Sequence, residues 1–454
     1  MTLNLQEILE CISGNLILKG RQQNFNKISI DTRSISNQEI FLAIGGNNFD
    51  GNKYILDAIK KGVRLCIIDK KYFEKDEFKD FDVSIILVEN TLRALEQLAI
   101  FVRSKISIPI IAVTGSVGKT TTKDLIHDFL SARHKVYKIF GNFNNHLGMP
   151  LSLINIDDDA EIGVFELGMS NLGEIDYLAK ILRPKIGVIT NIGESHIEFL
   201  KTRENILKAK MEITNYFGED NVLIINNEDD LLSTVNSSNF KLYKIGFSDE
   251  CDLYARNLKL NEDSIEYELT YLNEDKKVSI PILGKHNVLN SLIAFKICEI
   301  FDIPIQLIED KIKCLSGSSM RQEILKYKNM TIINDCYNAS PSSMKSSIDV
   351  LNLYSNIKVC ILGDMAELGE NSGSYHEEVG EYANGKIDKL IAIGQYSHFY
   401  CSKFDDKVNC FCFHTLAKFQ NEILKILNGA ETILIKASRS SKFERVINII
   451  EDKF

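Results

Sequence analysis

The chain has 454 residues, more than a single hydrophobic core supports, so two or three domains are expected. Its hydrophobic content of 44% and charged content of 25% are those of a globular protein, which excludes a largely disordered chain. The net charge of −9 offers no broad cationic surface, and this argues against nucleic-acid binding and binding to membrane surfaces. No apolar run is long enough to cross a bilayer. We therefore expect a cytoplasmic monomer without membrane insertion.

Residues 1–105 are predicted to form a small N-terminal α/β domain, which we call the first unit. Residues 1–15 lack a basic stretch followed by an apolar core, so they are predicted to form a structural helix and not a signal peptide. Short β-branched runs follow, separated by helical stretches. Strands are expected within residues 27–33, 39–46, 64–69 and 83–90.

Residues 106–315, the central unit, are predicted to hold a mainly parallel sheet of the P-loop ATPase type. Its expected strands are nearly continuous apolar runs, which is typical of a sheet covered on both faces. They lie within residues 108–115, 162–168, 185–193 and 221–229. An antiparallel addition is expected where polar and apolar residues alternate more regularly, within residues 252–260, 264–271 and 276–282. A helix is predicted to begin near Lys285.

Residues 316–454, the third unit, are predicted to form a C-terminal Rossmann-like domain. Strands and helices alternate again, with strands expected within residues 330–336, 357–364, 389–394 and 431–438. The predicted fold class is thus α/β, with three domains. The bounds of the units are expected to be accurate to within several residues.

The segment Thr114-Gly115-Ser116-Val117-Gly118-Lys119-Thr120-Thr121 follows a predicted strand and opens a predicted helix. Backbone N–H groups in such a loop favour anionic phosphates, Lys119 can reach the outer phosphates of ATP, and Thr120 can coordinate Mg²⁺. The usual phosphate-binding loop has a glycine where this chain has Val113. The alternative is an ordinary glycine turn. A GTPase is disfavoured because the guanine-reading N-K-x-D tetrapeptide is missing from the sequence.

Two further residues stand where predicted parallel strands end. Glu166 closes the run I-G-V-F-E and could bind a metal beside the loop. His196 follows the next apolar run, at the edge of the sheet where ligands of open α/β sheets bind. Taken alone, Glu166 is better explained as a solvated carboxylate and His196 as a hydrogen-bonded histidine.

Several longer motifs occur in a fixed order. They are G-N-F-N-N-H-L-G-M-P, T-N-I-G-E-S-H-I-E-F, K-A-K-M-E-I, G-K-H-N-V-L-N-S, M-R-Q-E-I, N-D-C-Y-N-A-S-P-S-S-M and L-G-D-M-A-E-L-G-E. With them, nearly the whole chain resembles the Mur ligase family. The family's loop is T-G-[ST]-x-G-K-[ST], so Val113 fits it. The resemblance implies three domains, and an activity in which ATP phosphorylates a peptide carboxylate and an amine then displaces phosphate from the acyl phosphate.

The resemblance also implies which substrates are joined. L-G-D-M-A-E-L-G-E is present and D-N-P-R is missing from the sequence, which favours addition of D-alanyl-D-alanine to UDP-N-acetylmuramoyl-tripeptide over addition of a diamino acid. This is a cytoplasmic step of peptidoglycan synthesis, and so of cell-wall growth, cell shape and cell division. Folylpolyglutamate synthase, a ligase with the same loop, is the nearest alternative. A non-catalytic nucleotide-sensing module is the other.

Residue roles follow from the same resemblance. Lys119, His196 and Lys210 are implied to be catalytic, and Lys210 is implied to be carbamylated, so that with Thr120, Glu166 and His196 it holds Mg²⁺. ATP is implied to contact residues 115–121 and three more distant positions: Asn287, Arg321 and Asp335. The substrates are implied to contact Thr32, Arg33, Asn47, Asn144, Asn145, Lys436 and Arg439. Without the resemblance, Lys210 would be read as a solvated lysine and Arg321 and Asp335 as members of surface ion pairs, while helix capping would explain Asn287 equally well.

Overall fold

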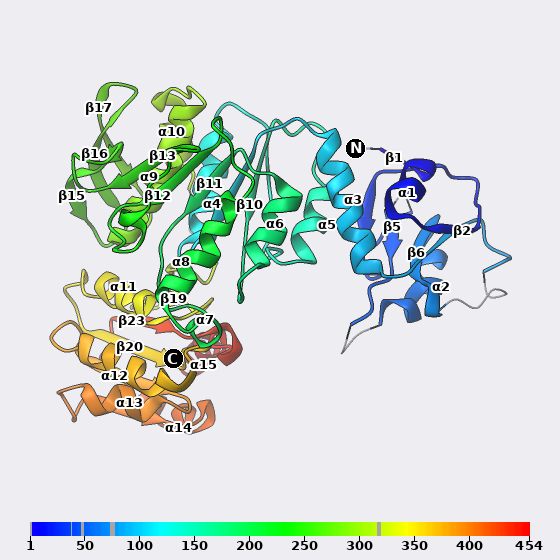
Figure 1. Cartoon of the computed structure of the whole chain (residues 1–454). Helices are drawn as coiled ribbons and strands as arrows, with labels where there is room; N and C mark the ends of the chain where they lie inside the picture. Colours follow the sequence, from blue (N-terminus) through cyan, green and yellow to red (C-terminus); the bar gives the residue numbers. More distant parts are fainter. Residues whose placement is uncertain (1, 38, 47–49, 73–77, 316–318) are drawn as a thin grey trace.

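The computed structural model describes residues 2–37, 39–46, 50–72, 78–315 and 319–454. In these ranges the chain forms three α/β bodies, coloured from blue through green to red in Figure 1. The first unit lies to one side of the central unit, and the third unit lies below it in this view. Across the same ranges, none of the helices has both the length and the apolar character needed to cross a membrane.

The first unit contains a five-stranded sheet in the order β2-β7-β6-β5-β4, antiparallel only at its edge strand β2. Helices α1 (Leu5–Ile12) and α3 (Thr91–Lys105) contribute to the buried cluster on one face of the sheet, and α2 (Ile55–Lys60) to that on the other. Helix α3 also packs on the central unit, against α5 and α6. The strands of this unit are β1 (Leu3–Asn4), β2 (Asn15–Leu18), β3 (Asn24–Phe25), β4 (Lys27–Ser29), β5 (Glu39–Leu42), β6 (Leu65–Asp69) and β7 (Ser84–Val88).

The central unit is built on a seven-stranded parallel sheet in the order β14-β13-β12-β11-β8-β10-β9. Every residue of β8 is buried, as is every residue of β10, β11 and β12, which confirms the prediction of a sheet covered on both faces. The strands are β8 (Ile110–Thr114), β9 (Val136–Lys138), β10 (Ile162–Glu166), β11 (Ile186–Ile189), β12 (Val222–Asn226), β13 (Lys241–Gly246) and β14 (Leu253–Tyr254).

Two helical layers cover this sheet. Helices α5, α6 and α8 contribute to one buried cluster, while α4, α9 and α10 contribute to the other together with an antiparallel sheet of three strands. These strands are β15 (Arg256–Leu260), β16 (Ile265–Tyr271) and β17 (Glu274–Ile280). The helices are α4 (Lys119–Leu130), α5 (Gly148–Ile154), α6 (Glu174–Leu182), α7 (Ile197–Leu200), α8 (Arg203–Met211), α9 (Lys285–Ile300) and α10 (Ile305–Ile312).

The third unit contains a six-stranded sheet in the order β18-β19-β23-β20-β21-β22, antiparallel only at β18. Its strands are β18 (Glu323–Tyr327), β19 (Met330–Asp335), β20 (Lys358–Gly363), β21 (Lys389–Ile393), β22 (Cys410–Phe413) and β23 (Thr432–Lys436). Its helices are α11 (Pro341–Leu351), α12 (Ser372–Tyr382), α13 (Ser397–Lys403), α14 (Leu416–Ile426) and α15 (Glu444–Lys453).

The strand order fixes where a ligand can enter. Strand β8 lies between β10 and β11, and the chain turns to opposite sides of β8 as it builds the rest of the sheet. Ligands of open α/β sheets bind beyond the carboxyl ends of the strands at such a point. Gly115, Leu167 and Thr190 follow the ends of these three strands, so their loops converge there.

Candidate functional site

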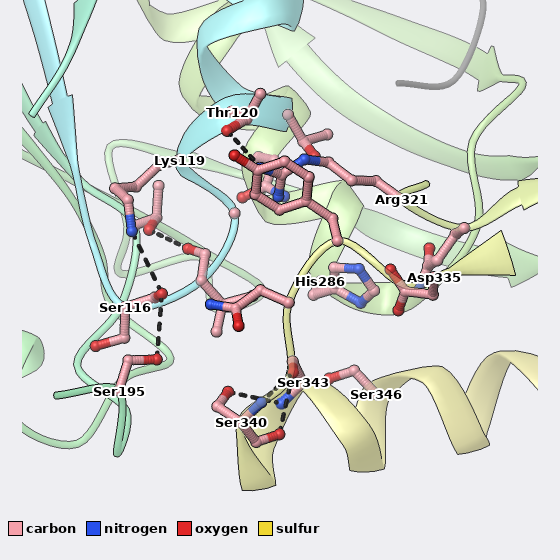
Figure 2. A pocket seen from close by; sticks show the side chains of 18 of the residues that line it. Ser116, Lys119, Thr120, Ser195, His286, Arg321, Asp335, Ser340, Ser343 and Ser346 are labelled. Carbon is pink, nitrogen blue, oxygen red and sulfur yellow. Dashed lines mark hydrogen bonds between the residues drawn. The ribbon is translucent and has the colours of Figure 1, made fainter. Parts of the chain in front are cut away.

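A cavity of about 940 Å³ lies beyond the carboxyl ends of β8, β10 and β11, between the central and third units. Residues of both units line it, including the whole loop from Ser116 to Thr121. Figure 2 shows labelled residues of the two units around this space. Thr32 and Arg33 belong to the first unit and are not among the lining residues. Asn47 lies outside the described residues.

The loop between β8 and α4 has a backbone that requires glycine at two positions. Gly115 has φ of +150°, and a Cβ added there would meet the Thr190 hydroxyl at 1.8 Å. Gly118 caps the start of α4 with φ of +84° and no side-chain capping bond. The first amides of α4 therefore have neither an intrahelical partner nor a side-chain cap, which is the arrangement that binds phosphate.

The segment after β11 holds the loop in place. Asn191 Oδ1 accepts a hydrogen bond of 2.8 Å from the Val117 amide, and the Thr190 hydroxyl donates one of 2.5 Å to the Val117 carbonyl. The Gly193 amide donates to the Ser116 hydroxyl at 2.9 Å. These bonds fix the loop before any ligand binds. Sequence reasoning missed them, although T-N-I-G directly follows an apolar run that ends beside the loop.

Two lysines with lowered pKa values lie at the site. Lys119 Nζ donates to the Gly115 carbonyl at 2.8 Å, and burial lowers its pKa, opposed by the charge of Glu166. Lys210, at the end of α8, is 1% exposed. Its pKa lies well below the ordinary value, because burial and then the charge of Lys119 disfavour its ammonium form. Within the described chain, no side chain or carbonyl accepts a hydrogen bond from Lys210 Nζ.

Thr120 and Glu166, predicted to share a metal ion, are in direct contact. The Thr120 hydroxyl donates to Glu166 Oε2 at 2.7 Å, and Asn144 Nδ2 donates to Glu166 Oε1 at 2.8 Å. Asn145 instead caps α5, because its Oδ1 accepts from the Gly148 amide at 2.8 Å. Both asparagines line the cavity. The described residues contain no cluster of three histidine, cysteine or acidic groups placed to hold a metal without further donors.

Arg321 of the third unit contacts the loop of the central unit. Its Nη2 donates to the Thr120 hydroxyl at 2.9 Å, across 201 positions of sequence, and its guanidinium stacks 3.8 Å from the centre of the Tyr337 ring. Figure 2 shows Arg321 beside Thr120. The two units are therefore already in contact at the loop, and the stack on Tyr337 limits the movement of the arginine.

Helix α9 contributes amide side chains to the cavity wall. Asn287 is 7% exposed, donates to the Leu283 carbonyl at 2.7 Å and accepts from Asn290 Nδ2 at 2.8 Å. A Cβ on Gly118 would come within 3.0 Å of Asn290 Oδ1, so this helix touches the loop. The confirmed start of α9 at Lys285 places His286 and Asn287 in its first turn.

Asp335 and Lys436 form a buried ion pair. They are register partners on β19 and β23, and Lys436 Nζ lies 2.5 Å from Asp335 Oδ2, which also accepts from the Ser347 hydroxyl at 2.6 Å. Lys436, predicted to bind a substrate anion, is 3% exposed and held by this carboxylate. Arg439 is the more accessible cation here; it pairs with Glu444 at 3.1 Å.

His196 faces a carboxylate of the third unit. Its Nδ1 lies 2.5 Å from Glu367 Oε2. The interaction with His196 lowers the pKa of the Glu367 carboxyl. Both residues have left-handed backbones, with φ of 66° and 61°, a conformation that is uncommon for residues other than glycine. Glu367 was not predicted.

The predicted substrate residues of the first unit have local partners. Arg33 is exposed and donates to both oxygens of Asp31, at 2.6 to 3.1 Å, which lowers the pKa of the Asp31 carboxyl to about 2. The Thr32 carbonyl accepts from Lys61 Nζ at 2.6 Å. A contact of Thr32 or Arg33 with a substrate remains a prediction.

His286 is expected to make the protein less stable in acid. Burial lowers its pKa to about 4, opposed by Asp335. The ordinary value is near 6.5, so the unfolded chain binds this proton first as the pH falls from 6.5 to 4, and the free energy of unfolding drops by at most about 3 kcal/mol. His286→Gln should remove this loss in urea denaturation at pH 7 and pH 4.5. His414→Gln, at an exposed site, is the control; an unchanged pH dependence of His286→Gln contradicts the prediction.

Known proteins resemble the whole chain. Residues 24–103, 113–298 and 320–439 match three family models, described as "Mur ligase family, catalytic domain", "Mur ligase middle domain" and "Mur ligase, glutamate ligase domain". The chain is 35% identical to the UDP-N-acetylmuramoyl-tripeptide–D-alanyl-D-alanine ligase of Bacillus subtilis, over 98% of this chain and 97% of the relative.

Solved structures agree. MurF from Acinetobacter baumannii has a TM-score of 0.91 and 26% identity over 100% of this chain and 99% of that one. MurF ligase from Thermotoga maritima, solved in complex with ADP, has a TM-score of 0.83 and 27% identity over 94% and 97% of the two chains. The family models together cover most of the sequence, one relative exceeds 30% identity, and the three-unit fold agrees with both. The chain belongs to the Mur ligase family.

Proposed function

We propose that this protein uses ATP to join D-alanyl-D-alanine to UDP-N-acetylmuramoyl-tripeptide, releasing ADP and phosphate, as a cytoplasmic step of peptidoglycan synthesis. The observation that carries the proposal is the meeting of Lys119 and Arg321 at one cavity between two units, with the buried Lys210 near enough to Lys119 for their charges to interact. A carboxylate is a poor acyl donor, and phosphorylation gives it a good leaving group. Joining two anions requires cations between them, and Lys119, Arg321 and bound Mg²⁺ would supply them.

ATP is proposed to bind between the central and third units, at residues 115–121, Asn287, Arg321 and Asp335. The fit is supported by the glycine backbone of the loop, because a Cβ at Gly115 would strike Thr190. Lys119 would move from the Gly115 carbonyl to the outer phosphates. Asp335 keeps Oδ1 for a ribose hydroxyl, since its ion pair and its hydrogen bond to Ser347 use Oδ2.

Mg²⁺ is proposed at Thr120 and Glu166, with a second ion near His196 and Lys210. The hydroxyl and the carboxylate lie 2.7 Å apart at the start of α4 and supply the oxygen donors that magnesium prefers. Two protein oxygens fit this ion, which usually keeps water and substrate phosphate as its other ligands. When bound, it would neutralise charge between the phosphates and the carboxylate.

Lys210 is proposed to be carbamylated. Its lowered pKa favours the neutral amine, whose nitrogen can attack CO₂ and lose a proton to form a carbamate. Lys210 Nζ has no acceptor in the described part of the chain, so no existing bond is lost. The new anion would offset the charge of Lys119 and add an oxygen donor.

The remaining predicted roles complete the proposal. The first unit (1–105) would hold the uridine nucleotide through Thr32, Arg33 and Asn47, the central unit (106–315) would bind ATP, and the third unit (316–454) would admit the dipeptide. Asn144 and Asn145 would contact the nucleotide-linked substrate, and Arg439, with Lys436 behind it, the dipeptide carboxylate. We propose that the protein acts as a monomer, with its central and third units lining the cavity.

Phosphate release with defined substrates tests the proposal. The protein is mixed with ATP, UDP-N-acetylmuramoyl-tripeptide and D-alanyl-D-alanine, and each substrate is omitted in turn. Release that requires all three supports the proposal. Release only with a folate and glutamate would instead identify a folylpolyglutamate synthase, and no turnover with either set would favour a nucleotide sensor.

Gly115→Ala is expected to weaken ATP binding at least about tenfold. The new Cβ would displace Thr190, which holds the loop through the Val117 carbonyl, and alanine rarely adopts φ of +150°. Titration calorimetry measures the affinity. Gly218→Ala, where the nearest atom lies 4.0 Å from the new Cβ, should bind ATP as the unchanged protein does. Equal affinities of both variants contradict the role given to the loop.

A further inference from the structure

Two loops of the third unit leave neighbouring strands side by side at the cavity. Strands β20 and β23 pair in register, with Leu362 opposite Lys436. Beyond their ends, the Ser438 amide donates to the Asp364 carbonyl at 3.1 Å, and the Ala366 amide donates to the Ser438 hydroxyl at 2.8 Å. Glu367 follows in the first loop and Arg439 in the second, and both line the cavity. The cavity is thus lined by the anionic Glu367 and the cationic Arg439 from these two neighbouring loops.

The loop that carries Glu367 is held by contacts with residues of the same unit. His376 Nε2 accepts from the Met365 amide at 3.0 Å, and its Nδ1 lies 2.5 Å from the Ser372 carbonyl. The Tyr396 ring stacks on this imidazole with the centroids 4.6 Å apart. Asp364 accepts from the amides of Gln395 and Tyr396. The loop is therefore fixed through its backbone, and the side chain of Glu367 is left 44% exposed.

The other carboxylates of the central and third units that line the cavity are engaged by side chains or backbone amides. Glu166 accepts from Thr120 and Asn144, and Asp335 is paired with Lys436. The remainder have partners near their own positions: Asp124 with Lys138, Asp128 with His127, Asp263 with Ser264, Glu174 with the Ser170 amide and Glu323 with the Met320 amide. Glu367 uses only Oε2, toward His196, and within the described chain its Oε1 has no hydrogen-bond donor.

We infer that Glu367 receives the ammonium group of the incoming dipeptide, with Arg439 receiving its carboxylate at the other end. The inference rests on the proposed function, because it names the residue that recognises that substrate's amine. D-alanyl-D-alanine is a zwitterion about 7 Å long when extended, so it needs opposite charges at its two ends. Lys119 and Arg321 line the same cavity and repel an ammonium, while the anion Glu166 is already engaged by Thr120 and Asn144. Glu367 is an anion of the third unit that lines this cavity, and its Oε2 lies 2.5 Å from Nδ1 of His196 in the central unit.

Steady-state kinetics of Glu367→Gln, which keeps the shape and removes the charge, tests the inference. The KM for D-alanyl-D-alanine should rise about 10- to 100-fold, the size expected for losing a charged hydrogen bond, while the KM values for ATP and the nucleotide-linked peptide change less than threefold. Glu367→Asp should recover part of the loss. Glu370→Gln, an exposed acid in the same loop region, is the matched control and should keep the KM of the unchanged protein.

A second nucleophile separates recognition of the amine from an effect passed through His196. Hydroxylamine is uncharged near neutral pH and can trap the acyl phosphate as a hydroxamate. If Glu367 recognises the ammonium, Glu367→Gln should lose at least tenfold more kcat/KM with D-alanyl-D-alanine than with hydroxylamine. Equal losses with both nucleophiles would overturn the inference. If the unchanged protein shows no turnover with D-alanyl-D-alanine, the proposed function itself has failed.

Discussion

Lys210→Ala should lower the rate of phosphate release by about 10³-fold or more while ATP still binds. Lys210 is buried and near enough to Lys119 for their charges to interact, and within the described residues no hydrogen-bond acceptor holds its amine. Its removal would take away the proposed carbamate and leave the charge of Lys119 uncompensated. Losses of this size are typical when a group that stabilises the transition state is removed. Stopped-flow or coupled assays give kcat, and calorimetry gives the ATP affinity.

Lys208→Ala is the matched control for Lys210→Ala. Lys208 lies on the same helix, α8, but is exposed. It should retain activity close to that of the unchanged protein. A carbon-13 NMR spectrum recorded under labelled CO₂ should contain a carbamate signal that Lys208→Ala keeps and Lys210→Ala loses. If Lys210→Ala is active and Lys208→Ala is not, the wrong lysine has been assigned.

Arg321→Ala should lower kcat by about 10²-fold, the second largest effect expected. Its guanidinium reaches the Thr120 hydroxyl at 2.9 Å from another unit and is held against Tyr337. A fixed cation there would stabilise the charge that develops on the transferred phosphoryl group. Arg321→Lys should recover little of the lost rate. An ammonium has neither the paired N–H donors of a guanidinium nor its planar shape, which stacks on Tyr337.

Arg183→Ala is the control for Arg321→Ala. Arg183 also stacks on a tyrosine, with its guanidinium 4.1 Å from the centre of the Tyr216 ring, but it does not line the cavity. It should keep a kcat within a factor of two. Equal rates for Arg321→Ala and Arg183→Ala would mean that the third unit adds no charge to the reaction.

Sequence patterns predicted the buried strands well and the edge strands poorly. Strands β8, β10, β11 and β12 are buried at every residue, and such runs are recognisable because nothing polar interrupts them. Strands β2, β13, β18 and β22 were not predicted. Strands β2, β18 and β22 lie at sheet edges and β13 lies next to the edge strand β14, and none of the four is buried throughout, so each lacks the continuous buried run that marks the central strands.

The candidate site divides in a similar way. The loop and its contact from Thr120 to Glu166 follow from local motifs and from parallel strands that end at the same edge. Long-range pairing could not be predicted from the residues alone: Asp335 meets Lys436 across 101 positions, and His196 meets Glu367 across two units. A sequence motif does not show whether a charged side chain is paired with a residue that is distant in the sequence. This explains why Lys436 looked accessible and why Glu367 was not singled out.

The most direct measurement follows the oxygen atoms of the accepting carboxylate. UDP-N-acetylmuramoyl-tripeptide labelled with ¹⁸O in its terminal carboxylate is turned over with ATP and D-alanyl-D-alanine, and the released phosphate is analysed by mass spectrometry. If the γ-phosphoryl group moves to that carboxylate and the amine then breaks the bond between carbon and oxygen, each phosphate carries one ¹⁸O atom. Phosphate without ¹⁸O would contradict an acyl-phosphate ligase and the central claim made for this cavity.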